Sequence, residues 1–163
     1  MTYPIAQIDE SMNSLKMSKM TEIEISYRND VQLESMDKIS SSAGAADYFR
    51  KIWSNRMDHI EEFVVICLNR ANRALGWALI SRGGMSGTVA DPKVIFQIAL
   101  KSSASSVIIG HNHPSGNLMP SESDVRLTQK LTKAGKAMDL PILDHIILTR
   151  KGHFSFADEG ILM

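Results

Sequence analysis

Short apolar runs recur along the chain after residue 60 and predict β-strands. The runs at 61–68 and 74–80 are separated by Asn69-Arg70-Ala71-Asn72, a polar stretch typical of the turn between antiparallel strands. A third run, Val107-Ile108-Ile109-Gly110, ends at a glycine and precedes polar residues, which favours a buried strand. We therefore expect strands at 61–68, 74–80, 107–110, 142–149 and 153–156.

Two helices are predicted by apolar residues at helical spacing behind a capping residue. The first follows Ser40-Ser41-Ser42, which offers an N-cap. Its expected core residues are Ala46, Phe49, Ile52 and Trp53. The second has Asp91 as N-cap and Pro92 at the first helical position, where the missing N–H of proline costs nothing. It is expected to end before the serine cluster at 102–106.

A third helix is predicted from Ser121 to about Met138. Its expected buried residues are Val125, Thr128, Leu131 and Met138. Because helices and strands alternate along the chain, the pattern predicts an α/β sandwich with a mixed sheet.

The first 39 residues follow a different pattern. Residues 1–20 are polar and rich in Met and Ser without a clear period, which favours a flexible segment. Residues 21–27 alternate polar and apolar and predict a half-exposed strand. That strand could pair with the edge of the domain or with another subunit, so a homo-oligomer stays open. We divide the 163-residue chain into an N-terminal extension, 1–39, and one domain, 40–163.

Composition narrows the class of protein. Lys plus Arg and Asp plus Glu both number 18, so no net charge attracts the protein to nucleic acid or to an anionic membrane. The single cysteine, Cys67, excludes an intramolecular disulfide and is expected to be a small buried hydrophobe. The chain shows no signal-peptide pattern and no run of the ~20 apolar residues that span a bilayer. We expect a cytoplasmic protein without a membrane partner.

The stretch from His111 to Asp124 has the most distinctive chemistry. His111 and His113 are two residues apart after a predicted strand, so both imidazoles can face one point. Asp124 lies in the first turn of the following helix. Two imidazoles and a carboxylate would leave a fourth tetrahedral position for water, the pattern of catalytic zinc sites. Ser121 with Asp124 also fits a capping box, which needs no metal, and the two interpretations are compatible.

The joint spacing of these residues, His-x-His, seven residues and then Ser-x-x-Asp, resembles the JAMM/MPN metalloprotease motif. Four further segments resemble the RadC branch of that superfamily: Gly110-His111-Asn112-His113-Pro114-Ser115-Gly116, Ser86-Gly87-Thr88-Val89-Ala90-Asp91-Pro92, Leu143-Asp144-His145-Ile146-Ile147 and Phe154-Ser155-Phe156. The resemblance covers roughly residues 40–163. It implies a three-layer, cytidine-deaminase-like sandwich and one Zn²⁺ per chain, with a bound water, on His111, His113 and Asp124.

The resemblance also implies a catalytic glutamate and a catalytic serine. The family's glutamate stands two residues before the first phenylalanine of its strand, here Phe63, so the match is Glu61. Glu62 is then expected to be a solvated neighbour on the opposite face. Because zinc lowers the pKa of bound water from ~15.7 to ~7, Glu61 is expected to shuttle a proton. Ser121 is expected to donate to the oxyanion of a tetrahedral intermediate, with helix capping as the alternative.

Two polar residues, Asp144 and His145, interrupt the apolar run at 142–149 and point to opposite faces. One of them could orient a ligand imidazole from behind, and a hydrogen-bonded core histidine is an equal alternative. His59 and His153 look like surface or turn residues.

The sequence supports several functions. The first hypothesis is a zinc-dependent hydrolase that cleaves a peptide or isopeptide bond in a protein or peptide substrate. The alternative, from the DNA-repair role historically attached to the RadC name, is a nucleic-acid-associated protein without proteolytic activity. Basic residues along one helix could hold phosphates, or form a solvated face that complements the helix dipole: Arg126, Lys130, Lys133 and Lys136. A third hypothesis is a binding module that retains only the fold.

Overall fold

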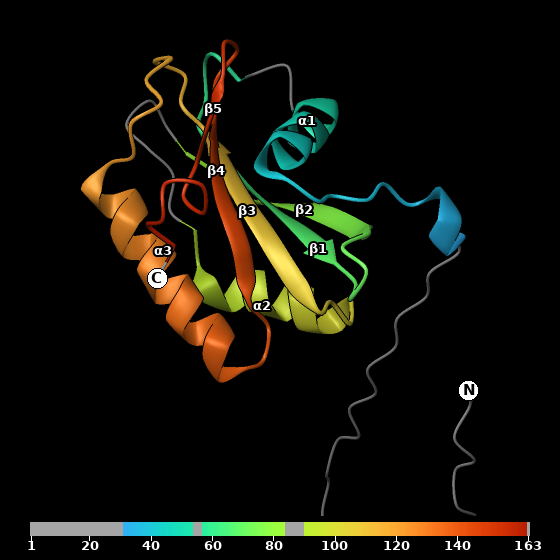
Figure 1. The fold of residues 1–163 in the computed structure, drawn as a ribbon. Coiled ribbons are helices and arrows are strands. Elements are labelled where there is room, and N and C mark those ends of the chain that lie inside the picture. Colours follow the sequence, from blue (N-terminus) through green and yellow to red (C-terminus); the bar gives the residue numbers. More distant parts are fainter. Residues whose placement is uncertain (1–30, 54–56, 84–89, 163) are drawn as a thin grey trace, which may run out of the picture.

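The computed structural model describes residues 31–53, 57–83 and 90–162 (Figure 1). The strands in this part of the chain are β1 (Glu62–Leu68), β2 (Ala74–Arg82), β3 (Ser106–Asn112), β4 (Ile142–Leu148) and β5 (His153–Ser155). The helices are α1 (Ser42–Ile52), α2 (Pro92–Lys101) and α3 (Glu122–Ala137), preceded by a 3-10 turn, η2 (Leu33–Ser35). The strand predicted at 21–27 lies outside the described residues.

The strands form one mixed sheet in the order β2-β1-β3-β4-β5. β3 and β4 are parallel, whereas β1 is antiparallel to both β2 and β3, and β4 is antiparallel to β5. A parallel pair needs a crossover connection, and α3 supplies it between β3 and β4. The mixed sheet predicted from the sequence is confirmed.

Helices cover both faces of this sheet, which gives three layers (Figure 1). On one face, α1 packs Phe49 against side chains of β1, β3 and β4, including Val64, Ile108 and Ile146. On the other face, α2 and α3 contribute Ile95, Phe96 and Leu131 to a second cluster, which includes Phe63, Val65 and Ile109. Alternate residues of β1 and β3 therefore enter opposite cores, as the period of two requires. The three-layer sandwich is confirmed.

A close approach between α1 and β3 occurs next to the predicted site. A Cβ atom placed on Gly110 would lie 2.7 Å from Cζ of Phe49, closer than side-chain carbons come. Gly110 therefore lets the Phe49 ring rest directly on the strand, one residue before His111. The fully buried ring fixes the height of α1 above the sheet at this point.

The ends of the helices follow the predicted capping pattern. Side chains of Ser41, Asp91 and Ser121 each accept a backbone N–H at the start of α1, α2 and α3. Two core predictions for α3 are wrong: Val125 is only half-buried and Met138 is 40% exposed. The reason is that α3 ends at Ala137 and its buried residues form a stripe of Thr128, Leu131, Thr132 and Gly135.

Trp53 and Cys67 are buried among apolar side chains, as expected. β3 is longer than predicted and includes His111 and Asn112. Among the described residues, no helix has both the length and the apolar character needed to cross a bilayer.

Candidate metal centre

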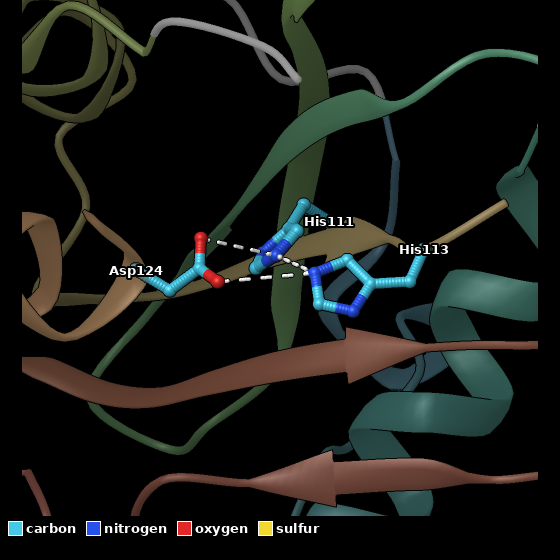
Figure 2. Close-up of side chains that lie close together, drawn as sticks. All are labelled: His111, His113 and Asp124. Carbon is cyan, nitrogen blue, oxygen red and sulfur yellow. Dashed lines mark hydrogen bonds and ion pairs between the residues drawn. The ribbon is translucent and has the colours of Figure 1, made fainter. Parts of the chain in front are cut away.

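The end of β3 and the start of α3 bring three predicted metal ligands together. His111 is the penultimate residue of β3, His113 follows the strand, and Asp124 lies in the first turn of α3. Figure 2 shows the two imidazoles and the carboxylate pointing toward one another. One ligand atom from each of the three residues lies within 4.8 Å of the other two.

The distances within this cluster fit a tetrahedral metal site. Nε2 of His111 lies 2.9 Å from Nε2 of His113. Oδ1 of Asp124 lies 3.4 Å from Nε2 of His111, and Oδ2 lies 3.8 Å from Nε2 of His113. With zinc–ligand bonds of ~2.0–2.1 Å, tetrahedral ligand atoms are about 3.3 Å apart. The three observed separations lie on both sides of that value, so a zinc ion fits with small side-chain adjustments.

Burial keeps His111 in the neutral form that a metal requires. Its side chain is only 1% exposed, and burial lowers its pKa to about 4 by disfavouring the charged imidazolium, although the Asp124 carboxylate acts in the opposite direction. His113 and Asp124 are each 14% exposed, so the cluster is closed behind His111 and more accessible beside the other two.

The loop after β3 fixes the tautomer of His113. Nδ1 of this imidazole lies 2.6 Å from the carbonyl oxygen of Asn117. Because a carbonyl can only accept, Nδ1 must bear the proton and Nε2 keeps its lone pair. Nε2 is the nitrogen of His113 that faces His111 and Asp124 (Figure 2).

The start of α3 fixes the carboxylate of Asp124 through a capping box with Ser121. The backbone N–H and the hydroxyl of Ser121 both donate to Oδ2 of Asp124, at 2.7 and 2.6 Å. The N–H of Asp124 donates to Oγ of Ser121 in return, at 3.2 Å. The capping interpretation of Ser121 is confirmed, and capping leaves Oδ1 turned toward His111. The oxyanion role of Ser121 stays a prediction.

A further histidine lies directly behind the cluster. Nε2 of His145, in β4, is 2.8 Å from Nδ1 of His111, and Nδ1 of His145 is 2.6 Å from Oγ1 of Thr128 in α3. The sequence left two alternatives for His145, a partner that orients a ligand imidazole and a hydrogen-bonded core histidine. Both apply, because this buried histidine contacts the candidate ligand His111. Its pKa is well below the usual value, because of burial and the nearby imidazoles. The sequence singled out Thr128 only as a core residue.

Asp144 faces away from the cluster and organises the chain after β5. Its carboxylate accepts the hydroxyl of Ser155 at 2.6 Å and the N–H of Ala157 at 3.0 Å. Burial raises the pKa of this carboxyl, against the effect of the hydrogen bonds. His59 lies exposed in a turn as expected, whereas His153 is half-buried in β5.

The two glutamates at the start of β1 differ from the expectation in one respect. Glu62 is not solvated: it is 2% exposed, and its Oε1 accepts Nε–H of Arg82 at 2.7 Å. The reason is the pairing of β1 with β2, which places Arg82 opposite Glu62 and supplies a counter-charge. Glu61 is half-buried, directly before β1. Phe63, two residues on, stacks its ring on His111 with centroids 5.9 Å apart.

A residue that the sequence did not single out ties this segment to β3. Asn112 is fully buried. Its Oδ1 accepts the N–H of Glu62 at 2.7 Å, and its Nδ2 donates to the carbonyls of Met57 and Ile60 at 2.6 and 2.9 Å. One amide between the two histidines therefore holds the backbone that leads into Glu61. A polar amide between two candidate ligands, directly after a buried strand, was the available signal.

A cavity of about 330 Å³ lies beside the cluster and has His113 in its lining. Arg150 and Lys151 also line it, and Asp58 pairs with Arg150. Ligand pockets begin at about this size. The cavity is therefore at the lower end of the size range of ligand pockets.

The fold and the site define a class of protein: an α/β sandwich in which two histidines at a strand end and a carboxylate at a helix start form a candidate metal site. Residues 39–161 match the family model of the RadC-like JAB domain. The chain therefore belongs to the RadC-like JAB family, which confirms the resemblance found in the sequence.

Curated relatives agree with this assignment. A UPF0758 protein of Flavobacterium johnsoniae is 41% identical over 126 residues, which are 77% of this chain and 54% of the relative. A UPF0758 protein of Gloeothece citriformis is 41% identical over 128 residues, 76% of this chain and 51% of the relative. One of Porphyromonas gingivalis is 44% identical over 103 residues, 63% of this chain and 45% of the relative. The chain spans about half the length of these relatives, and their names state no activity.

Proposed function

We propose that this protein is a zinc-dependent hydrolase that cleaves a peptide or isopeptide bond. One observation supports the proposal most directly: His111, His113 and Asp124 offer three ligand atoms within 4.8 Å of one another at the end of a strand. Two neutral imidazoles and one carboxylate leave a divalent ion with a net charge of about +1 and one open position. The resemblance to JAMM metalloproteases points to the same chemistry.

Zinc held by these residues would supply an acidified water as nucleophile and a Lewis acid for the substrate carbonyl. The protein's own residues would then move a proton from the water to the leaving amine, which is the role proposed for Glu61. β1 and β3 pair Phe63 with His111. Glu61 precedes Phe63 by two residues and His113 follows His111 by two, so a continuation of this antiparallel register would bring Glu61 opposite His113. Side chains opposite each other in such a pair share one face.

Ser121 would contribute by donating its hydroxyl to the oxyanion of the tetrahedral intermediate. In the structure that hydroxyl donates to Asp124, so the donation would require the Ser121 side chain to exchange partners. A hydrogen-bond donor at such a position contributes ~10²–10³ in rate elsewhere. A protein or peptide is the substrate class that fits this chemistry.

The nucleic-acid hypothesis has weaker support. Arg126, Lys130, Lys133 and Lys136 are all exposed on α3. Arg126 already pairs with Glu122 at 3.0 Å, an interaction typical of a solvated helix surface. The RadC-like family assignment names no nucleic acid as partner, so this role remains a prediction.

The proposed function is tested by metal content and by cleavage of a peptide library. We expect the purified protein to bind one zinc per chain, and His113→Ala to lose both zinc and turnover. Glu61→Gln should keep zinc and lose turnover by at least ~10²-fold, because proton transfer is removed while all ligands remain.

Glu62→Gln is the matched control, because it makes the same chemical change one residue away on the opposite face of β1. We expect it to keep both zinc and turnover, with a small loss of stability from the weakened pair with Arg82. A protein that refuses added zinc, or equal effects of the two glutamine variants on turnover, would contradict the proposal.

A further inference from the structure

His145 and Thr128 form a chain of short contacts that begins at α3 and ends on a candidate ligand. The hydroxyl of Thr128 donates to the backbone carbonyl of Asp124 at 2.6 Å. Oγ1 of the same threonine lies 2.6 Å from Nδ1 of His145, whose Nε2 lies 2.8 Å from Nδ1 of His111. Binding of a metal by His111, His113 and Asp124 assigns no role to Thr128 or His145.

The direction of each hydrogen bond in the chain follows from the first one. A hydroxyl has one proton, and the proton of Thr128 is committed to a carbonyl that can only accept. Oγ1 must therefore accept from Nδ1–H of His145. A neutral imidazole with a proton on Nδ1 has a bare Nε2, which accepts from Nδ1–H of His111. Nε2 of His111 is then left with its lone pair, facing His113 and Asp124.

We propose that Thr128 and His145 act as positioning residues: they form a one-way hydrogen-bond relay that holds His111 in the tautomer able to bind a metal. The metal-binding consequence rests on the proposed function. The proton positions themselves belong to the metal-free protein and do not depend on it.

The reverse direction is opposed by the contact between Thr128 and Asp124. If Nε2 of His145 held the proton, Thr128 would have to donate to Nδ1 of His145. Its oxygen would then face the carbonyl of Asp124 at 2.6 Å without a proton between them, a repulsive contact. In that arrangement His111 would accept at Nδ1 and would hold its own proton on Nε2, where no metal could bind. The relay direction leaves the unprotonated Nε2 atoms of His111 and His113 2.9 Å apart, a contact that a bound metal would relieve.

The surroundings protect the relay from water and from charge. The ring of His145 stacks on Phe156 at 4.6 Å, and the ring of His111 stacks on Phe63 at 5.9 Å. Thr128, His145 and His111 are each at most 1% exposed. Because all three side chains are buried among these rings, water cannot replace either hydrogen bond and a charged imidazolium is disfavoured.

The relay also links two candidate ligands through one turn of α3. Asp124 gives its carboxylate to the metal cluster and its backbone carbonyl to Thr128, four residues later on the same helix. His145 then spans from α3 to His111 on β3. The lone pair of His111 and the carboxylate of Asp124 are therefore aligned by the same helical turn.

The relay is tested first by long-range ¹H–¹⁵N correlation spectra of the metal-free protein at neutral pH. We expect His111 and His145 to hold their protons on Nδ1, with Nε2 unprotonated in both. A proton on Nε2 of either residue would overturn the relay. Because no metal is present, this result stands apart from the outcome of the zinc and cleavage experiments.

Variants of Thr128 test the consequence for metal binding. Thr128→Val removes the acceptor for His145 and should weaken zinc affinity by about 10- to 100-fold, the usual effect of losing a partner behind a ligand. It should also move the proton of His145 to Nε2. Thr128→Ser keeps the hydroxyl and should retain both the affinity and the tautomer.

Thr132→Val is the matched control, because it makes the same change one turn further along α3. Oγ1 of Thr132 is buried and has no hydrogen-bond partner among the described residues, so zinc affinity should not change. Equal losses of affinity in Thr128→Val and Thr132→Val would overturn the relay, as would a Thr128→Val protein with unchanged affinity and tautomers.

His145→Gln, whose amide oxygen can accept from His111, should bind zinc more tightly than His145→Phe.

Discussion

Gly110 shows how a single residue without a side chain positions the candidate site. It lies in β3 directly before His111, and Phe49 of α1 occupies the space that any Cβ atom would need. Because the Phe49 ring is fully buried, it cannot swing into solvent to make room. A larger residue would therefore have to move α1 or β3, and β3 leads directly into the two histidines.

Gly110→Ala is expected to lower the free energy of unfolding by about 1–3 kcal/mol, the usual cost of overpacking a core. Urea unfolding measures this loss. Gly76→Ala in β2 is the control, because a Cβ atom there meets no other atom within 4 Å and should cost little. Equal losses in the two variants would show that the contact with Phe49 is unimportant, and partial recovery in Gly110→Ala with Phe49→Leu would support it.

At the scale of elements, α3 connects the two ends of the site. Its N-terminus presents Asp124 through the capping box with Ser121, and its second turn presents Thr128 to His145. The helix also makes the crossover between the parallel strands that hold His111 and His145. A change at its N-cap should therefore affect both helix stability and the metal cluster.

Ser121→Ala is expected to lower the free energy of unfolding by about 0.5–2 kcal/mol through loss of the N-cap. It should also weaken zinc binding, because Asp124 loses the hydroxyl that donates to Oδ2. Asp91→Ala removes the corresponding cap of α2 and should give a similar stability loss with unchanged zinc affinity. Thermal unfolding and zinc competition titrations measure the two effects. Unchanged zinc affinity in Ser121→Ala would show that this hydroxyl does not contribute to metal binding.

At the scale of the whole molecule, the fold holds two neutral imidazoles in its interior. Burial lowers the pKa of His111 to about 4 and lowers that of His145 as well, whereas both would titrate near 6.5 in the unfolded chain. Between these values the unfolded state binds more protons than the folded state. Folding stability therefore rises with pH in this window and is complete above it.

The metal-free protein is expected to lose stability as the pH falls from about 6.5 to about 4. The pKa of His111 alone accounts for on the order of 3 kcal/mol, and His145 acts in the same direction. Asp144, whose pKa is raised by burial, opposes this loss near the acid end. Urea unfolding at pH 7, 6 and 5 measures the slope. His111→Phe should reduce it, and equal stability at pH 7 and pH 5 would contradict the burial of neutral imidazoles.

Much of the scaffold could be predicted because local pattern decides it. Short apolar runs identified the strands β1 to β5. The serines at 40–42, Asp91 and Ser121 were recognisable as helix caps. Boundaries were less certain: β3 continues to Asn112 because its pairing with β1 and β4 extends past the apolar run. Met138 was misplaced because an apolar side chain at the end of a helix is buried only if something covers it.

The sequence by itself determined the residue types and spacing of the candidate ligands, His111, His113 and Asp124, because strand alternation and a helix start are local properties. Only the tertiary structure decided that Glu62 is buried against Arg82 and that Asn112 holds the segment before Glu61. It alone joined His145 and Thr128 to His111. These contacts cross between strands and layers, and their partners are set by sheet order and register, which no local pattern encodes.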